Sequence, residues 1–556
     1  MDITLIPETA PFNAEQRAWL NGFLAGWLGL REANGTDGAN GTALNGAAAL
    51  GAASNGAATP ALPAAETKAE AEPWHDPALP IDERLKLAEG KPLARRLMAA
   101  MAQLDCGSCG YLCKTYSEAI AHGSETSLTL CSPGGSETAK ALKRLVKENK
   151  SGTDGAATNI TATNGAVTNG TAADGMAKPS PNGLNGWSRK NPFTAKLLRT
   201  VNLNGPGSEK ETRHIEIDLA GGPSYEVGDS LGIIPENCGA LVDDLIAALG
   251  AKDDEPVTTV SGAETTLRDA LARHCCLKEI SEDLLEQLAH EAADPEQASQ
   301  LRALVDDDAP ISGFDLLDLL RRFPSARPSP ADLVAALAEL KPRLYSISSS
   351  PKRHAGQVHL TVRRVAFESN GRLRKGVAST MLADRVEPGA ALRVFVQKSH
   401  GFTIPADPNA PAIMIGPGTG IAPFRAFLHE RDALGAKGPN WLFFGDQRST
   451  EDFLYEDELT DFLRRGVLTR LDTAFSRDQS GKIYVQHRIS QRGADLFDWL
   501  EHGAHVFVCG DAKRMAADVD RALREVVRVH GRMSEEQAAA YIAALASSGR
   551  YCRDVY

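Results

Sequence analysis

At 556 residues, the chain is long enough for several domains with substantial cores. Its 72 acidic and 60 basic residues give a formal net charge of −12, which argues against nucleic acid and anionic membrane surfaces as partners. No apolar run reaches the roughly 18 residues of a transmembrane helix, and the N-terminus lacks a basic start and an apolar signal core. We therefore expect a cytoplasmic protein.

The N-terminal third divides into two structured pieces and two polar connectors. Residues 1–31 carry apolar side chains at the spacing of an amphipathic helix, which predicts self-association or docking on a partner. Residues 32–75 and 150–186 are rich in small and polar residues such as Ala, Gly, Asn and Thr, a composition typical of flexible linkers. Between the linkers, residues 76–149 form a predicted compact island.

The island contains four of the nine cysteines, Cys106, Cys109, Cys113 and Cys131. In a reducing compartment this crowding favours a metal or cluster over disulfides. Four thiolates can close a tetrahedral zinc site or hold an iron–sulfur cluster. Zinc fingers usually pair two C-x2-C knuckles, whereas three bunched cysteines among glycines, with a distant fourth, favour a [4Fe–4S] cluster. Zinc, or no metal at all, is the alternative.

From Trp187 onward the composition is globular. Residues 193–235 alternate in strand fashion, including Tyr225–Asp229, and strands return after Pro342. We expect an antiparallel barrel over residues 187–410, interrupted by a helical insert at about 236–341. From residue 411 to 556, apolar strands, Gly turns and helices alternate, which predicts a parallel α/β domain. The expected fold class is thus α/β and β, with a small helical four-cysteine domain.

The segment Arg343-Leu344-Tyr345-Ser346 has an unusual composition for a strand. A guanidinium neutralises a diphosphate, a Tyr ring lies against a flat ring system, and a Ser hydroxyl donates to a ring nitrogen. Thirty residues later, Gly376–Ser379 opens a predicted helix, whose free N–H groups favour a phosphate. Each piece alone fits an ordinary strand or a capped helix, but together they indicate flavin binding.

Two further segments indicate a dinucleotide. Gly416–Phe424 lies between an apolar strand and a helix, where a tight turn and a helix start suit a diphosphate, although it is not a G-x-G-x-x-G. Ser476-Arg477 and Lys482–Gln486 follow another strand and offer two cations, a hydroxyl and an aromatic ring. That set suits a ribose 2′-phosphate and a stacked adenine, which favours NADPH over NADH. An ordinary turn and a solvated loop are the structural alternatives.

Two more residues have a functional and a structural interpretation. Cys509 ends a predicted buried strand, where parallel sheets bind ligands, but it also fits as a small core residue. Tyr556 is the last residue, and its ring can cap a flat cofactor or belong to a frayed tail.

Many motifs occur in the order found in a known family. They are Arg343–Ser346, Gly376–Ser379, Gly416–Pro423, Phe443–Gly445, Thr450–Tyr455, Ser476–Gln479, Lys482–Gln486, Cys509–Asp511 and Asp554–Tyr556. With them, residues 187–556 resemble the flavoprotein subunits of assimilatory NADPH–sulfite reductases, in the ferredoxin–NADP reductase and diflavin reductase group. The N-terminal helix also resembles the segment that those subunits use for assembly.

The resemblance implies roles for individual residues. FAD would be held by Arg343, Leu344, Tyr345, Ser346, Thr361, Val362, Arg363, Gly376, Val377, Ala378 and Ser379. The other cofactor-binding residues, mainly for NADPH, would be Thr419, Ser476, Arg477, Lys482, Ile483, Tyr484, Val485, Gln486 and Asp518. Ser346, Cys509 and Asp554 would surround the hydride path, and Tyr556 would shield the flavin ring until nicotinamide displaces it.

The sequence departs from this family before residue 187. The family carries an FMN domain there, whereas this chain has the four-cysteine island, which resembles the small iron–sulfur domain of the corrinoid iron–sulfur protein. NADPH delivers two electrons together, and a haem acceptor takes one at a time, so a one-electron relay is needed. We therefore expect electrons to pass from NADPH through FAD and [4Fe–4S] to a sulfite reductase hemoprotein. The alternatives are a ferredoxin, flavodoxin or nitrite reductase as acceptor, with the cysteines holding zinc in a scaffold.

Overall fold

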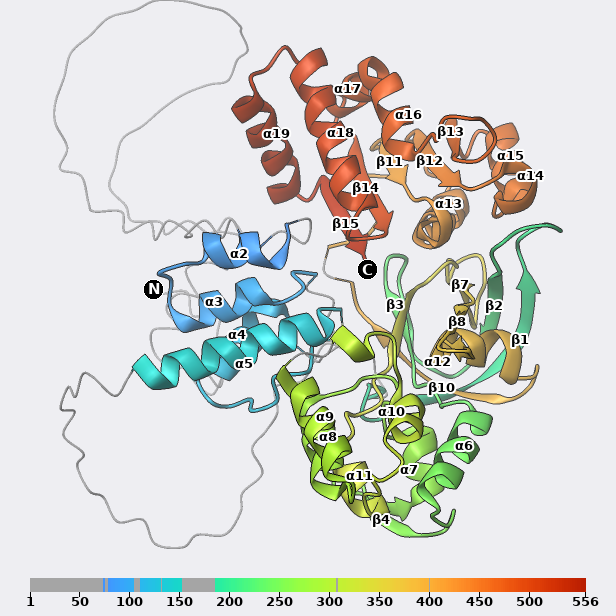
Figure 1. The fold of residues 1–556 in the computed structure, drawn as a ribbon. Coiled ribbons are helices and arrows are strands. Elements are labelled where there is room, and N and C mark those ends of the chain that lie inside the picture. The colour runs from blue at the N-terminus through green and yellow to red at the C-terminus, as the bar shows by residue number, and fades with distance from the viewer. Residues whose placement is uncertain are drawn as a thin grey trace, which may run out of the picture. The chain divides into compact units, whose positions relative to one another are not determined.

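A computed structural model describes residues 74–75, 79–104, 111–131, 133–152, 186–306, 309–399 and 401–556 (Figure 1). The predicted N-terminal helix, most of both predicted linkers, and Cys106 and Cys109 lie outside these residues. No described helix combines the length and the apolar character needed to cross a membrane.

The described part of the island is helical. Its helices pack because each contributes large side chains to one core, including Leu97, Tyr116 and Leu142, all fully buried or nearly so. The helices are α2 (Ile81–Leu87), α3 (Leu93–Ala100), α4 (Cys113–Ala121) and α5 (Gly135–Gly152).

The next domain is built on an antiparallel sheet with the strand order β6-β3-β10-β1-β2-β7. Alternate side chains such as Ala195 and Leu197 in β1, and Ile215 and Ile217 in β2, point into one core. An isolated bridge between Ile347 and Leu360 joins the two edges, so the sheet closes on itself. We call this region the barrel domain. Its elements are β1 (Phe193–Asn202), β2 (Thr212–Asp218), β3 (Ser230–Ile233), β6 (Arg343–Ser346), β7 (Gln357–Arg363), β8 (Ala366–Ser369), β9 (Arg372–Lys375), α12 (Val377–Thr380), the π-helical turn η2 (Met381–Arg385) and β10 (Ala391–Gln397).

The strand predicted at Tyr225–Asp229 is wrong, because these residues form a turn that leads into β3. The Asp229 carboxylate accepts a hydrogen bond from the Glu226 backbone N–H at 2.8 Å, and Gly228 takes a φ of +100°. A short-range Asp bond and a positive φ both stop an extended strand.

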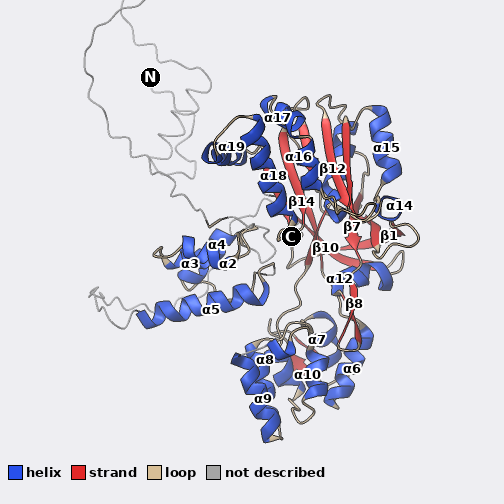
Figure 2. Ribbon diagram, turned by 45° about the horizontal axis from the view of Figure 1, so that its top comes forward, coloured by secondary structure: helices blue, strands red, loops and turns tan. Residues whose placement is uncertain are grey.

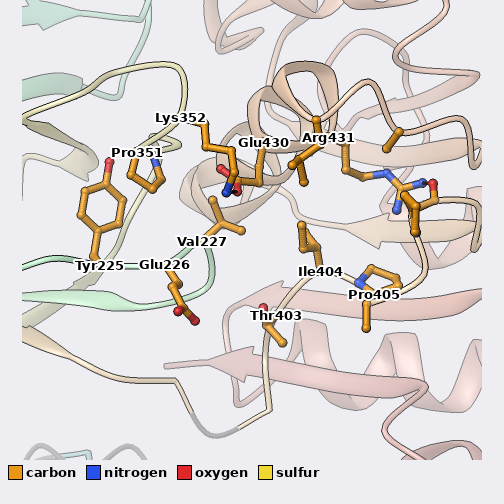
Figure 3. A pocket seen from close by; sticks show the side chains of 14 residues that line it. Tyr225, Glu226, Val227, Pro351, Lys352, Thr403, Ile404, Pro405, Glu430 and Arg431 are labelled. Carbon is orange, nitrogen blue, oxygen red and sulfur yellow. Dashed lines mark hydrogen bonds and ion pairs between the residues drawn. The ribbon is translucent and has the colours of Figure 1, made fainter. Parts of the chain in front are cut away.

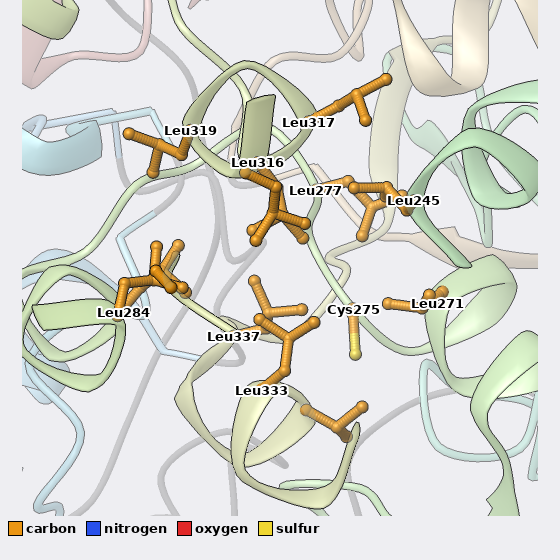
Figure 4. Packing of buried hydrophobic residues seen from close by; sticks show 14 of the residues in the cluster. Leu245, Leu271, Cys275, Leu277, Leu284, Leu316, Leu317, Leu319, Leu333 and Leu337 are labelled. Carbon is orange, nitrogen blue, oxygen red and sulfur yellow. The ribbon is translucent and has the colours of Figure 1, made fainter. Parts of the chain in front are cut away.

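A helical insert separates β3 from β6. Thr266, Ser281, Asp315 and Ser329 each begin a helix by accepting a hydrogen bond from a backbone N–H three residues on. Leucines from several of these helices converge on one apolar core (Figure 4). The elements are α6 (Gly239–Leu249), β4 (Pro256–Thr258), β5 (Glu264–Thr266), α7 (Leu267–Arg273), α8 (Glu282–Glu291), α9 (Pro295–Asp306), η1 (Ala309–Ile311), α10 (Leu316–Arg322) and α11 (Pro330–Ala336).

The C-terminal domain contains a parallel sheet of order β13-β12-β11-β14-β15, with helices on both faces (Figure 2). Its central strands β11 and β12 are buried except at Asp446, the last residue of β12, as expected for strands covered on both sides. The predicted antiparallel sheet and parallel C-terminal sheet are therefore confirmed. The elements are β11 (Ala412–Ile415), η3 (Gly418–Ile421), α13 (Ala422–Ala433), β12 (Asn440–Asp446), α14 (Ser449–Asp452), α15 (Glu456–Arg465), β13 (Arg470–Phe475), α16 (Val485–Gln491), α17 (Gly493–Glu501), β14 (His505–Gly510), α18 (Met515–His530), α19 (Glu535–Ser547) and β15 (Tyr551–Val555).

Candidate active site

Three of the predicted catalytic residues meet where the barrel domain contacts the parallel sheet. Cys509 of β14 lies beside Asp554 of β15 in the strand register. The Asp554 Oδ2 accepts a hydrogen bond of 2.5 Å from the Ser346 Oγ of β6, and the Cys509 Sγ lies 3.8 Å from the same oxygen. One carboxylate therefore connects both domains.

Burial controls the ionisation of this group. Burial raises the pKa of Asp554, although the Ser346 and Cys509 contacts oppose that change. Burial and the neighbouring Asp554 carboxylate raise the pKa of the Cys509 thiol well above its usual value. Cys509 is therefore present as a thiol beside a carboxyl that accepts the Ser346 hydrogen bond.

The C-terminal tyrosine is held over the same strand ends. The Tyr556 backbone N–H donates to the Gly510 carbonyl at 3.0 Å, and the Ala512 N–H donates to the Tyr556 carbonyl at 3.1 Å. Its phenol oxygen lies 2.9 Å from the Thr419 Oγ1, and the side chain is 56% exposed. An anchored but exposed ring offers a flat apolar surface at the carboxyl edge of a parallel sheet, where such sheets bind ligands.

The Gly-rich turn after β11 lies against the end of β14. A Cβ at Gly420 would stand 2.1 Å from the Cys509 carbonyl oxygen, so no side chain fits there. The turn leads into the 12-residue helix α13, whose first backbone N–H groups favour a diphosphate. The helix begins at Ala422 rather than at Phe424, where the sequence pattern placed it.

The predicted 2′-phosphate residues follow β13. The Ser476 and Arg477 backbone N–H groups donate to Asp446 and Gln447, which fixes this loop on the end of β12. The Arg477 Nη1 lies 2.6 Å from the Glu209 Oε1 of the barrel domain. Lys482 is exposed.

The remaining nucleotide residues lie around the start of α16. Tyr484 is 43% exposed and stacks on His487, with ring centroids 5.8 Å apart. The Gln486 Nε2 donates to the Asp518 Oδ2 of α18 at 3.1 Å. Val485 is buried in the domain core, and Ile483 packs against that core, so these two side chains position the loop.

The predicted flavin residues come from β6, β7 and α12. The Arg343 Nη1 donates to the Lys341 carbonyl at 2.7 Å, and Leu344 and Tyr345 are half-buried. In β7, the Thr361 hydroxyl contacts Tyr455, Val362 is buried in the barrel core, and Arg363 is exposed.

Gly376 precedes α12, where Val377 is half-buried and Ala378 and Ser379 are buried. The Ser379 Oγ accepts a hydrogen bond of 3.2 Å from the Val365 N–H, which fixes α12 against the end of β7.

Sequence reasoning missed the polar contact between the two domains. The buried Arg425 of α13 donates to the Ser348 carbonyl at 2.7 Å and to the Glu458 carboxylate at about 3 Å. Its guanidinium also lies over the Tyr455 ring, 5.0 Å from the centroid. Burial alone would raise the pKa of Glu458, but the neighbouring His429 and Arg425 outweigh it and lower this pKa to about 2.

Histidine rings surround this contact. The Tyr455 phenol oxygen lies 3.0 Å from the His214 Nδ1, and the His214 and His359 centroids are 5.0 Å apart. His354 lies 4.3 Å from His359 by the same measure. Burial, assisted by nearby cations, lowers the pKa of His214 to about 3, of His359 to about 2 and of His354 to about 4. The signal in the sequence was a run of charged residues inside the otherwise apolar helix after the Gly turn.

A pocket of about 360 Å³ opens elsewhere along the same contact (Figure 3). The Lys352 ammonium and the Glu430 carboxylate meet there at 2.5 Å, beside Tyr225. None of the predicted cofactor residues lines this pocket.

Two of the four predicted metal ligands lie among the described residues. Cys113 is the first residue of α4, and Cys131, which is 8% exposed, precedes α5; both belong to the same apolar cluster. Within the described ranges, no group of three or more His, Cys, Asp and Glu side chains is arranged to hold a metal. Cys106 and Cys109 lie outside those ranges, so the four-ligand site stays a prediction.

Comparison with known proteins agrees with this geometry. Residues 186–381 match the family described as "FAD binding domain", and residues 414–521 match "Oxidoreductase NAD-binding domain". The chain carries the paired FAD-binding and NAD-binding domains of an oxidoreductase.

Individual proteins with similar sequences extend this finding. The chain is 45% identical over 384 residues to the sulfite reductase [NADPH] flavoprotein alpha-component of Bacillus subtilis, covering 68% of this chain and 64% of that protein. The corresponding protein of Yersinia pestis is 45% identical over 375 residues, covering 66% of this chain and 61% of the relative. The matched segment thus spans somewhat less than two thirds of these relatives.

Proposed function

We propose that this chain is an NADPH-dependent flavoprotein that passes electrons from NADPH through FAD and a [4Fe–4S] cluster to a sulfite reductase hemoprotein. The observation that carries the proposal is the Ser346–Asp554 hydrogen bond with Cys509 beside it. It brings together a strand of the FAD-binding domain and the strand ends of the NAD-binding domain. Two rings that exchange a hydride must meet at such a boundary.

The residues fit the two cofactors in distinct ways. FAD, when bound, takes up an electron pair and releases electrons singly. Arg343 and the start of α12 would hold its diphosphate, and Ser346 would lie beside its ring. Burial raises the pKa of Asp554, and its carboxyl would accept the Ser346 hydrogen bond beside the hydride path. Tyr556 would hold the nicotinamide position and exclude water from it.

The residues expected to bind the adenosine part of the nucleotide favour a phosphorylated one. Arg477 and Lys482 supply positive charge after β13, and the exposed Tyr484 ring can stack on adenine. Gly420 lets the turn pack directly against the end of β14, which places the start of α13 beside the strand ends. These features favour NADPH over NADH.

The described cysteines support the cluster. Cys113 and Cys131 are separated by a helix in the sequence, yet both pack in one apolar cluster beside the N-terminal ends of α4 and α5. A helix N-terminus stabilises a thiolate, which is the form that ligates iron. The one-electron relay and the NADPH-oxidising flavin domain would then lie in one chain. The separate hemoprotein would accept single electrons from the relay.

Anaerobic stopped-flow reduction of the full chain by NADPH tests the pathway. We expect the yellow flavin band to bleach first and the broad brown cluster band to bleach afterwards, followed by reduction of added hemoprotein. A preparation without flavin and cluster colour contradicts the proposal. If the chain rapidly reduces a flavodoxin but does not reduce the hemoprotein, the acceptor is a flavodoxin and not the hemoprotein.

Substitution at the cluster separates its two halves. In Cys106→Ser, NADPH should still reduce FAD, whereas iron content and transfer to the acceptor should be lost. Cys238→Ser is the matched control, because Cys238 precedes α6 in the helical insert and is not one of the four predicted ligands. If Cys106→Ser keeps the iron content and the electron-transfer rate of the wild type, the cysteines do not form the relay. If the wild-type chain instead contains stoichiometric zinc, the four cysteines form a zinc-binding scaffold and not an iron–sulfur cluster.

A further inference from the structure

The loop between β1 and β2 of the barrel domain is fixed on the parallel-sheet domain at several points. The Gly205 N–H donates to the Glu451 carbonyl at 2.7 Å, and the Asn204 Nδ2 donates to the Asp452 carboxylate at 2.9 Å. Ser208 also donates to Asp452, and Lys210 forms an ion pair with the buried Asp446. The backbone is therefore held on both sides of Glu209.

The Glu209 side chain makes fewer contacts than those of its neighbours in this loop. Its side chain is 64% exposed, and among the described residues it has one ion pair, from its Oε1 to the Arg477 Nη1 at 2.6 Å. Arg477 is 37% exposed, and its charge lowers the pKa of Glu209, so the carboxylate is ionised. A rotation of the Glu209 side chain, without movement of the loop, would free the guanidinium.

We propose that Glu209 is an internal competitor for the nucleotide 2′-phosphate, and that it limits the preference for the phosphorylated nucleotide over the unphosphorylated one. The proposal rests on the proposed use of NADPH and on Arg477 as its phosphate ligand. A phosphate monoester carries more charge than a carboxylate and offers three acceptor oxygens, so it can displace a single-contact carboxylate from a guanidinium. A nucleotide without the 2′-phosphate cannot gain this contact and leaves Glu209 in place.

The position of Glu209 also lowers the affinity for the phosphorylated nucleotide. Once displaced, the carboxylate remains tethered close to the phosphate, because Ser208 and Lys210 hold the loop. Two like charges at this distance repel each other. Glu209 therefore weakens NADPH binding and keeps Arg477 neutralised while the site is empty.

The test compares two nucleotides and two inhibitors on the full-length holoenzyme. In Glu209→Gln, the KM for NADPH and the inhibition constant of 2′,5′-ADP should fall about two- to five-fold, a range typical of exposed ion pairs. The KM for NADH, the inhibition constant of 5′-ADP and kcat should not change. Glu211→Gln is the matched control, since Glu211 pairs with Arg213 and Arg364 instead of Arg477.

A double substitution identifies the partner. Arg477→Ala should raise the inhibition constant of 2′,5′-ADP, and adding Glu209→Gln to it should have no further effect. The proposal is overturned if Glu209→Gln leaves the 2′,5′-ADP constant unchanged, shifts NADH equally, or acts equally in the Arg477→Ala background. Failure of the wild-type chain to oxidise NADPH would instead contradict the proposed function, and calorimetric binding of 2′,5′-ADP would still test Glu209.

Discussion

The helical insert and the contact between the barrel and parallel-sheet domains are both buried, but they use different residue types. The insert core is formed mainly by leucines, such as Leu284, Leu317 and Leu333, all fully buried (Figure 4). The domain contact instead uses Arg425, Glu458 and histidine rings. Apolar packing is not directional, whereas hydrogen bonds and ion pairs fix distances and angles.

The two regions are therefore expected to contribute differently to folding stability and to the alignment of the domains. Two cofactors that must exchange a hydride need a geometry fixed to within a fraction of an ångström. Under the proposed function, we expect the polar contact to fix the two domains relative to each other and the leucine core to contribute mainly to folding stability. Changes in the two regions should therefore affect different measurements.

The largest effect on stability is expected in the leucine core. Leu317→Ala removes a fully buried side chain and should lower the free energy of unfolding by about 2–5 kcal/mol. Denaturant unfolding measures this loss, while flavin reduction per folded molecule should be unchanged. Leu434→Ala, at a side chain that is 50% exposed, is the control and should cost far less. A slower flavin reduction in folded Leu317→Ala would break the separation.

The largest effect on rate is expected at Asp554. Asp554→Asn keeps the size of the side chain but removes its ionisable carboxyl. NADPH should therefore reduce the flavin about a hundredfold more slowly. Stopped-flow absorbance measures the rate, and the thermal midpoint should change little. Asp495→Asn, at an exposed carboxylate on α17, should leave the rate as in wild type. An unchanged rate in Asp554→Asn would remove Asp554 from the hydride path.

A smaller effect is expected from pH at the domain contact. The folded-state pKa values of His214, His359 and His354 lie below their usual 6.5, so the folded state favours neutral rings. Their contribution is present above pH 6.5 and is lost as the pH falls toward these lowered values. The pKa of Glu458, about 2, lies below its ordinary 4.5, so its contribution is lost at still lower pH.

Urea unfolding at pH 7 and pH 5 measures the histidine contribution. We expect each ring that stays neutral in the folded state to contribute at most about 2 kcal/mol to the loss, because the unfolded ring takes up a proton over this range. His359→Asn should reduce this pH dependence. The same slope in His359→Asn and wild type would assign the loss to other groups.

The sequence predicted the two sheets because their patterns are local. Apolar strands followed by Gly turns, as at Gly416–Phe424, indicate a parallel sheet without knowledge of any partner. The turn at Tyr225–Asp229 was mistaken for a strand because alternation of side chains does not reveal a positive φ at Gly228.

The contacts between domains were less predictable. Arg425 and Glu458 are far from the barrel residues in the sequence, and their pairing depends on the closed tertiary structure. Ser346, Cys509 and Asp554 were grouped by resemblance, since no spacing rule connects residue 346 with residue 554. Glu209 carried no signal of its own, because one Glu in a polar loop is ordinary.

Tyr455 precedes α15 as its N-cap and has a φ of +59°, a left-handed backbone conformation that L-residues with side chains adopt at a cost of about 1–2 kcal/mol. Its hydroxyl reaches Thr361 at 2.7 Å and His214 at 3.0 Å, both in the barrel domain. If the nucleotide-binding half were produced as a separate fragment, these anchors would be missing and the start of α15 could relax. Dissecting the chain at residue 400 would then yield halves whose contact surfaces differ from those in the intact protein.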